Sequence, residues 1–236
     1  MSNTYFQFKE FIVHQEHCAM KVCTDSCVFG AWVTSWADSK KRVLDIGAGT
    51  GLLMLMLAQK SSGRIDGIEI EPACFEQLKS NLTLSPWADR FQALKGDVRE
   101  FQFTEKYDLV LSNPPFFSSD LLSKSGTNRI ARHSIELTLA ELFDTVTRLL
   151  TADGNFALLL PYHRLEEAVE FSQNYGLNII FQVRVFHTRK HKPFRVLFYF
   201  GNQPVQEVKI SDFVIKNDAG YTPEFVELLK DYYLNF

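Results

Sequence analysis

Short apolar runs alternate along this chain with stretches whose apolar residues recur at helical spacing. The runs have the length of buried strands and lie at residues 43–46, 64–69, 107–112 and 154–160. The helical stretches lie at residues 52–59, 139–150 and 164–175, and Thr138 with Glu141 forms a capping box ahead of the second. This alternation of strand and helix predicts an α/β fold with a doubly wound, mainly parallel sheet.

The last third of the chain predicts a hairpin and a closing helix. Two apolar runs, at residues 178–186 and 194–200, flank a polar loop at 187–193. Because a tight loop joins them, we expect the last strand of the sheet to be antiparallel. The final helix opens with Thr222 as its cap and Pro223 in its first turn.

Composition favours one domain without a membrane segment. The 236 residues are 46% hydrophobic and 14% aromatic, which is ample for a three-layer core. No apolar run approaches the ~20 residues of a membrane helix, and residues 1–4 show no basic start followed by an apolar stretch. We therefore expect a cytoplasmic protein whose residues 1–236 form a single domain. The aromatic-rich residues 5–13 predict a short hairpin or strand ahead of a core at 42–236.

A glycine-rich turn follows the first buried strand. Gly47, Gly49 and Gly51 let the backbone approach a ligand closely at the carboxyl end of that strand, and the next helix presents N–H groups at its start. The spacing is G-x-G-x-G, whereas the dinucleotide fingerprint needs G-x-G-x-x-G and position 52 is Leu. The turn therefore predicts a nucleotide-type cofactor site that does not bind pyrophosphate.

Acidic residues follow the next two strands. Glu69 ends the second strand roughly 20 residues after the first glycine, where a ribose diol needs a two-oxygen acceptor. Glu71 ranks behind it, because Pro72 marks the first position of the next helix. Asp97 follows a further short strand and is a candidate acceptor for the adenine amine of a cofactor. An ordinary turn aspartate is the alternative for Asp97.

The segment Asn113-Pro114-Pro115-Phe116 directly follows the run at 107–112. Each Pro fixes its own φ and lacks an N–H, so the strand ends in a rigid hook. The Asn113 side-chain oxygen and a backbone carbonyl of Asn113 or Pro114 can accept both hydrogens of an exocyclic amine, with Phe116 as a flat face for a ring. A plain strand-terminating turn is the alternative. Together with the glycine turn, the hook predicts methylation of an amine such as N6 of adenine.

These motifs together resemble the class I S-adenosylmethionine-dependent methyltransferases, in particular the group that methylates amines. Flanking segments resemble the bacterial tRNA1(Val) adenine-N6 methyltransferases, and they lie at residues 20–25, 30–32, 131–133, 221–223 and 232–234. This similarity spans nearly the whole chain. It implies a seven-stranded sheet, S-adenosylmethionine as methyl donor with S-adenosylhomocysteine as product, and an adenine at tRNA position 37 as target.

The chain departs from the family pattern in two places. Ser26 and Cys27 stand where a Gly followed by an aliphatic residue is usual, and Phe116 stands where Tyr is also found. Residues 1–41 are expected to form an N-terminal extension that walls the cofactor. The catalytic candidates are Asn113, Pro114, Pro115 and Phe116. The cofactor candidates are Lys21, Thr24, Asp25, Asp45, Gly47, Gly49, Gly51, Glu69, Asp97 and Asn113.

Positive charge is concentrated in one region although the formal net charge is −3. Residues 171–206 contain no Asp or Glu, and their cations include Arg184. We expect these cations to crowd one sheet edge and contact RNA locally, since the whole protein does not attract a polyanion. Solvated surface charge is the alternative. The RNA-binding candidates are Arg189, Lys190, Lys192 and Arg195, with Arg129, Arg132 and His133 after a polar loop at 118–128; the start of a surface helix is the alternative for these last three.

Four cysteines, Cys18, Cys23, Cys27 and Cys74, lack paired CxxC spacing. Three of them lie near histidines, so a zinc site is conceivable, but zinc ligands usually come in tighter pairs. We expect no metal and reduced, partly buried thiols, in keeping with a cytosolic setting.

Three other activities fit the same motifs. A protein glutamine-amide methyltransferase uses the same hook, but only about 40 residues precede the glycine turn, too few for the helical recognition domain that such enzymes are associated with. A DNA adenine methyltransferase is expected to carry a separate target-recognition domain. A noncatalytic RNA-binding protein on the same fold is the third. The intact motifs favour a tRNA methyltransferase that acts as a monomer without an obligate protein partner.

Overall fold

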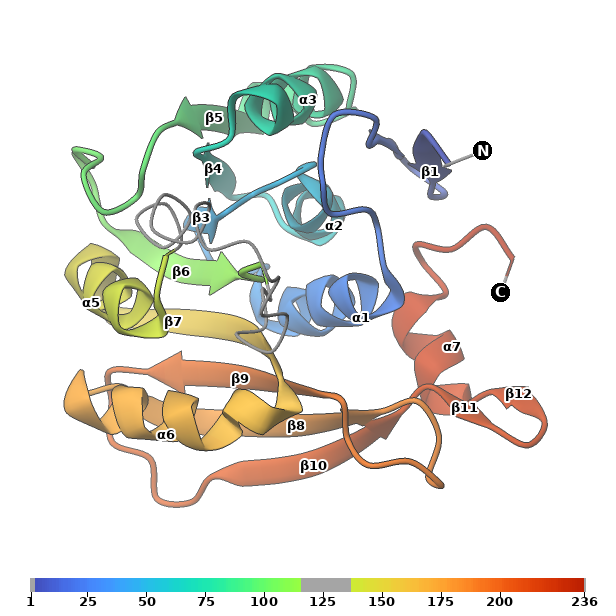
Figure 1. The fold of residues 1–236 in the computed structure, drawn as a ribbon. Helices are drawn as coiled ribbons and strands as arrows, with labels where there is room; N and C mark the ends of the chain where they lie inside the picture. Colours follow the sequence, from blue (N-terminus) through green and yellow to red (C-terminus); the bar gives the residue numbers. More distant parts are fainter. Residues whose placement is uncertain (1–2, 116–136, 236) are drawn as a thin grey trace, which may run out of the picture.

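A computed structural model of the chain describes residues 3–115 and 137–235 (Figure 1). Its centre is an eight-stranded sheet with the order β10-β8-β9-β7-β6-β3-β4-β5. In chain order, the strands are β3 (Arg42–Ile46), β4 (Arg64–Glu69), β5 (Phe91–Lys95), β6 (Tyr107–Ser112), β7 (Leu150–Pro161), β8 (Asn178–Phe186), β9 (Arg195–Gly201) and β10 (Lys209–Val214). The predicted α/β fold with a mainly parallel sheet is confirmed.

Within this sheet, only β9 runs antiparallel to its neighbours. It pairs antiparallel with β7 and β8, whereas β8 and β10 pair in parallel. The predicted antiparallel hairpin strand is therefore confirmed, and the predicted count of seven strands is wrong by one. The additional strand is β10, whose first three residues are exposed. Because such a polar edge strand lacks a buried apolar run, the apolar pattern does not reveal it.

Helices cover both faces of the sheet, each over its own core. One face is covered by α1 (Thr24–Val33), α2 (Leu52–Lys60), α3 (Pro72–Thr83) and α7 (Pro223–Leu229). The other is covered by α5 (Leu139–Leu149) and α6 (Leu165–Asn174) (Figure 1). Short 3-10 turns complete the helices at η1 (Thr34–Trp36), η2 (Ala88–Arg90) and η3 (Tyr162–Arg164). None of the helices in the described ranges is long and apolar enough to cross a membrane.

The local signals at the helix starts are confirmed. Thr138 accepts a hydrogen bond from the backbone N–H of Glu141, and the Glu141 side chain accepts one from the N–H of Thr138. Thr222 accepts from the N–H of Phe225 at the start of α7, with Pro223 in the first turn. Each cap satisfies donors that the first helical turn leaves free, which fixes where the helix begins.

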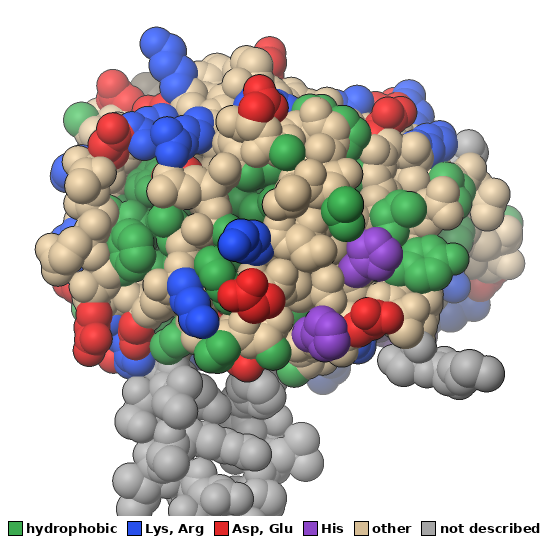
Figure 2. All heavy atoms as spheres, turned by 90° about the horizontal axis from the view of Figure 1, so that it is seen from above, with side chains coloured by type: hydrophobic (Ala, Val, Ile, Leu, Met, Phe, Trp, Pro, Cys, Tyr) green, Lys and Arg blue, Asp and Glu red, His purple; other side chains and the backbone are tan. Residues whose placement is uncertain are grey.

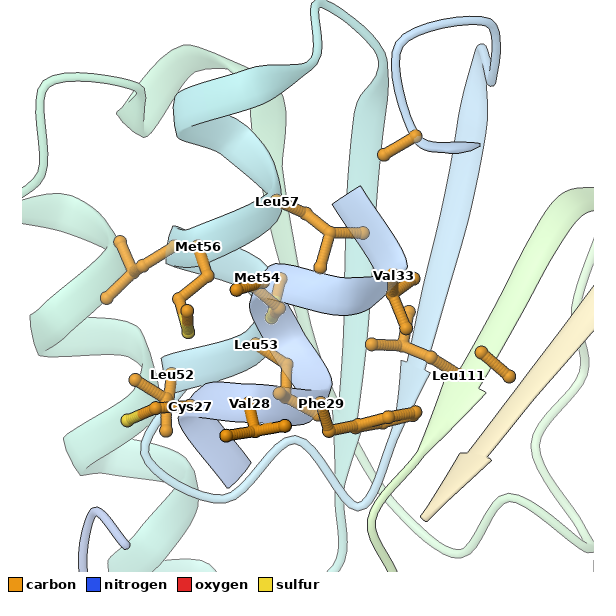
Figure 3. Packing of buried hydrophobic residues seen from close by; sticks show 14 of the residues in the cluster. Cys27, Val28, Phe29, Val33, Leu52, Leu53, Met54, Met56, Leu57 and Leu111 are labelled. Atoms are coloured by element: carbon orange, nitrogen blue, oxygen red, sulfur yellow. The ribbon is translucent and has the colours of Figure 1, made fainter. Parts of the chain in front are cut away.

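Helix α1 packs tightly on α2, and this contact fixes the part of the chain that reaches the candidate site. Buried side chains of the two helices interdigitate, among them Phe29, Leu53 and Met56 (Figure 3). A Cβ atom built on Gly30 of α1 would lie 2.7 Å from the sulfur of Met56, so glycine at this position lets the two helices pack without displacing the Met56 side chain. This packing places the first turn of α1 near the candidate site.

The two ends of the described chain meet. The predicted N-terminal hairpin is confirmed as β1 (Tyr5–Gln7) and β2 (Ile12–His14). The backbone N–H of Lys9, in its turn, donates to the carbonyl of Tyr232 at 2.8 Å. A second small hairpin, β11 (Lys216–Asn217) and β12 (Gly220–Tyr221), precedes α7.

The expectation of reduced thiols is wrong for two of the four cysteines, because Cys18 and Cys74 form a disulfide with a Cα–Cα distance of 4.7 Å. The reason is tertiary. Asn81 of α3 accepts from the N–H of His14 at 3.0 Å and donates to its carbonyl at 2.8 Å, and this brings the segment after β2 beside α3. Cys23 and Cys27 are free thiols, and burial raises their pKa to about 11 and about 12.

Candidate active site

The carboxyl ends of β3, β4 and β6 bring the main candidates together. Ile46 pairs with Ile68 on one side and with Ser112 on the other, so the residues that follow these three lie at the same sheet edge. These next residues are Gly47, Glu69 and Asn113. Ligands of open α/β sheets bind at this edge, and the sequence motifs therefore share one site.

The glycine turn lies open where a ligand would approach. Gly47, Gly49 and Gly51 have φ values of 74°, 58° and 82°, a region that side chains rarely adopt. A Cβ on Gly47 would meet nothing within 4 Å, and one on Gly49 would meet only the Gly47 carbonyl at 3.9 Å. Gly51 differs, because its Cβ would lie 2.8 Å from Leu78 of α3. The first two glycines thus face open space, and the third permits helix packing.

The backbone N–H groups of the turn are held inside the protein. Gly47 and Ala48 donate to the carbonyl of Ile68 at 3.0 and 3.1 Å. Gly49 donates to the Glu69 side chain at 2.9 Å. These bonds fix the turn rigidly against the end of β4.

The structure separates the two acids after β4. Glu69 is 8% exposed, and its two oxygens accept from the N–H groups of Gly49 and Glu71. A carboxylate has about four acceptor sites, so Glu69 can still bind two hydroxyls. Glu71 instead caps α3 by accepting from the N–H of Cys74 at 2.6 Å, with Pro72 in the first turn. This capping role favours Glu69 as the ribose candidate.

Asp45 on β3 is a buried carboxyl without a partner. It is 1% exposed, and neither of its oxygens has a hydrogen-bond partner among the described residues. Burial, and secondly the charge of Glu69, raises the pKa of Asp45 to about 8. An orphaned buried carboxyl costs free energy, which a ligand with donor groups or positive charge would recover. S-adenosylmethionine has both, so the open turn and this acid fit it.

Asn113 directly follows β6, and the nitrogen and oxygen of its side-chain amide have different surroundings. Its Nδ2 donates to the Ser26 hydroxyl at 2.8 Å. Its Oδ1 is buried and has no partner among the described residues. Pro114 is buried and Pro115 exposed, whereas Phe116 lies outside the described residues. The hook therefore presents an unused acceptor, as the amine-binding hypothesis requires.

The N-terminal cofactor candidates lie around the first turn of α1. Lys21 donates to the carbonyl of Gln15, and Thr24 is exposed at the start of the helix. Asp25 is buried and forms an ion pair with Arg195 at 2.7 Å. A cofactor candidate and an RNA candidate, 170 residues apart, are thus bound to each other.

Asp97 already forms an ion pair with the neighbouring Arg99 side chain. Its two oxygens accept from the Arg99 guanidinium at 2.5 and 2.9 Å, and Oδ1 also accepts from the backbone N–H of Arg99. Hydrogen bonds from Arg99 lower the pKa of Asp97. This geometry favours the turn-aspartate alternative for Asp97.

Acids from elsewhere in the chain neutralise the basic hairpin. Arg184 and Arg189 both pair with Asp212 of β10, at 2.7 and 2.8 Å, and Lys190 pairs with Asp218 at 2.6 Å. Arg184 and Arg189 thus lie beside β10, the edge strand of the sheet, which pairs with β8 and supplies the carboxylate. Lys192 is exposed, and no ion pair involves it within the described ranges. Arg129, Arg132 and His133 lie outside the described residues.

Charge is also mixed away from the hairpin. On the face seen from above the view of Figure 1, Lys and Arg side chains are interspersed with Asp and Glu (Figure 2).

No group of three or more His, Cys, Asp or Glu side chains suited to a metal ion occurs in residues 3–115 and 137–235.

Sequence reasoning missed the contacts that shape the site. The bond between Ser26 and Asn113 spans 87 residues of sequence. Its one sequence signal is Ser26 itself, which departs from the family pattern. The pairs that Arg195 and Arg189 form with acids carried no local signal.

Comparison with known proteins agrees with the geometry. The family model of the Methyltransferase small domain matches residues 32–159. Two solved structures share the fold: the Agrobacterium tumefaciens protein Atu636, a predicted O-methyltransferase (TM-score 0.61, 17% identity, 89% of this chain and 99% of that one), and the glycopeptide N-methyltransferase MtfA complexed with sinefungin (TM-score 0.56, 15% identity, 79% and 89%).

Full-length relatives narrow the family. The tRNA1(Val) (adenine(37)-N6)-methyltransferase of Dyadobacter fermentans is 41% identical over 99% of both chains. Proteins of the same name from Parabacteroides distasonis and Tolumonas auensis are each 36% identical, over 99% of this chain and 99% and 98% of theirs. On these similarities, together with the glycine turn and the Asn-Pro-Pro hook, the chain belongs to the tRNA1(Val) (adenine(37)-N6)-methyltransferase family of class I S-adenosylmethionine-dependent methyltransferases.

Proposed function

We propose that this protein transfers the methyl group of S-adenosylmethionine to the N6 amine of an adenine in tRNA, at position 37 beside the anticodon of tRNA1(Val). One observation carries the proposal: Asn113 Oδ1 is a buried acceptor that no described residue satisfies, at the sheet edge that holds the open glycine turn. A buried acceptor is costly unless a donor binds it, and an exocyclic amine supplies such donors.

Residues of the β3 and β4 ends would hold the cofactor. S-adenosylmethionine supplies an electrophilic methyl group when it is bound. Glu69 would accept hydrogen bonds from the ribose hydroxyls, Gly47 and Gly49 leave room for the nucleoside, and Asp45 would offer a buried carboxyl group. Residues 1–41 form the wall beside this site, since α1 reaches Asn113, and residues 42–236 form the catalytic core of a single domain.

Asn113 prepares the target amine. The adenine must leave its stack to reach the site, which costs a few kcal/mol and least in a single-stranded loop. Asn113 Oδ1 and a backbone carbonyl of Asn113 or Pro114 then accept the two amine hydrogens, which draws the nitrogen toward tetrahedral geometry and frees its lone pair. The stacking role of Phe116 belongs to the same proposal.

The RNA is proposed to bind along the basic hairpin. Lys192 is exposed, and the ion pairs of Arg189 and Lys190 lie at the surface, where phosphates can compete with carboxylates. Because its substrate is a tRNA, we propose that the enzyme acts in the cytoplasm. We also propose that it acts as a monomer.

The first test is methyl transfer from labelled S-adenosylmethionine to bulk tRNA that lacks the modification, followed by digestion to nucleosides. We expect labelled N6-methyladenosine, and Asn113→Ala should lower kcat by roughly 10²- to 10³-fold while cofactor affinity barely changes. Asn202→Ala is a matched control, because its amide donates to Thr151 at the opposite sheet edge.

Other outcomes would redirect the proposal. Label in a protein fraction but not in tRNA would assign the hook to a glutamine amide. Cofactor binding without transfer to RNA, protein or DNA would support a noncatalytic RNA-binding protein. An Asn113→Ala enzyme with full turnover would remove Asn113 from the reaction.

A further inference from the structure

Ser26 contacts the hook from the first turn of α1. Its hydroxyl accepts from Asn113 Nδ2 at 2.8 Å and lies 3.0 Å from the sulfur of Cys23. Ser26 is 4% exposed. This hydrogen bond joins α1 to the residue that directly follows β6.

A serine hydroxyl both donates and accepts, so this contact selects one orientation of the amide when the Ser26 hydrogen points at the Cys23 sulfur, 3.0 Å away, and leaves the oxygen as acceptor. The terminal torsion of Asn is broad and roughly two-fold, so an unrestrained amide exchanges its oxygen and nitrogen. With Nδ2 bound to Ser26, Oδ1 takes the other position, where it is buried and accepts from no residue in 3–115 or 137–235. The flipped amide would point N–H groups at an amine that itself donates, which is repulsive.

Helix α1, which carries Ser26, packs closely on α2. A Cβ atom on Gly30 would lie 2.7 Å from the Met56 sulfur, and Cys27, Val28 and Phe29 beside Ser26 are buried. The Cys23 thiol stays protonated near neutral pH because burial raises its pKa to about 11. The hydroxyl of Ser26 therefore faces a neutral thiol on one side and the Asn113 amide on the other.

We propose that Ser26 is a positioning residue that fixes the Asn113 amide with its oxygen toward the target amine. The inference rests on the proposed function, and it concerns a feature of this chain, because the family resemblance leads us to expect glycine at this position.

The test compares Ser26→Ala and Ser26→Gly with the unchanged enzyme. Loss of one neutral hydrogen bond should lower kcat about two- to tenfold, with unchanged affinity for S-adenosylmethionine. The effect should vanish in an Asn113→Ala background, because Ser26 acts through that amide. Ser172→Ala is the control: it also removes a buried hydroxyl, which donates to the carbonyl of Val169 on α6, and should leave kcat unchanged.

A spectroscopic measurement separates this inference from the proposed function. The side-chain amide signal of Asn113, assigned by its loss in Asn113→Ala, should show one protected proton that becomes unprotected in both Ser26 variants. This readout holds even if the protein methylates no tRNA. Unchanged kcat with an unchanged amide signal, or an equal loss of kcat in the Asn113→Ala background, would overturn the positioning role.

Discussion

The two halves of the sheet differ in how their ionisable side chains are buried and paired. On the β3 and β4 side, the carboxyl of Asp45 is buried near Glu69, and it has no hydrogen-bond partner in the part of the chain that the structure describes. On the β8 and β10 side, Arg184 and Arg189 share one carboxylate, Asp212, at the surface.

The difference separates two kinds of binding. A site that holds one small cofactor can keep an unsatisfied group, because the ligand recovers the cost each time it binds. A surface for a polyanion has to stay soluble without it, and exposed ion pairs, worth about 0–1 kcal/mol each, do this while remaining easy to exchange. The β3 and β4 half of the sheet therefore suits tight binding of a small cofactor, and the β8 and β10 half suits readily reversible binding of a polyanion.

The largest expected effect concerns the cofactor half. Asp45→Asn removes the buried carboxyl group at nearly constant shape, and we expect S-adenosylmethionine affinity to fall roughly 10- to 100-fold, the value of a hydrogen bond to a charged ligand group. Isothermal titration calorimetry measures it. Asp66→Asn is the control, because Asp66 is equally buried but accepts from the Tyr107 hydroxyl at 2.9 Å. Equal affinity in Asp45→Asn and the unchanged protein would break the comparison.

The same acid predicts how stability depends on pH. The folded-state pKa of Asp45 is raised from 3.8 to about 8, so the folded protein holds a proton that the unfolded chain releases. Its contribution to the free energy of unfolding is fully present below pH 3.8 and is lost as pH rises toward 8. Urea denaturation of the cofactor-free protein across this range should show the decline, and Asp45→Asn should flatten it. An identical slope in both proteins would contradict the raised pKa.

On the basic half, Lys192→Ala should have a smaller effect. Removing one phosphate contact should weaken tRNA binding a few-fold and reduce the slope of log K against log salt by about 1. Filter binding at several salt concentrations tests this. Lys60→Ala is the control, since Lys60 pairs with Asp231 away from the hairpin. Equal slopes in Lys192→Ala and the unchanged protein would place the RNA elsewhere.

The smallest expected effect has the opposite sign. Asp212→Asn frees Arg184 and Arg189 from their shared carboxylate, so tRNA should bind more tightly, by no more than about fivefold, because exposed ion pairs are weak. Asp144→Asn, which breaks the pair with Arg148 on α5, should leave tRNA binding unchanged. Weaker tRNA binding by Asp212→Asn would show that the pairs organise the surface rather than compete for it.

Sequence reasoning predicted what local pattern controls. The strand and helix alternation, the glycine turn and the capping box at Thr138 each depend on neighbours in sequence, and the structure has them. It failed where partners are distant. Strand β10 is polar and is recognised as a strand only through its pairing with β8, and the Asp25–Arg195 pair joins residues 170 apart. Tertiary packing decides which acid pairs with which cation, so the local sequence pattern does not predict these pairs.

The Cys18–Cys74 bond reaches beyond the folded state. It joins residues 56 positions apart, so in the denatured ensemble it closes a long loop and removes chain entropy of about 3 to 5 kcal/mol in the loop-closure model. Oxidised and reduced preparations of this protein are then two thermodynamically different materials. Melting curves recorded with and without a reductant should not be compared as though they described one species.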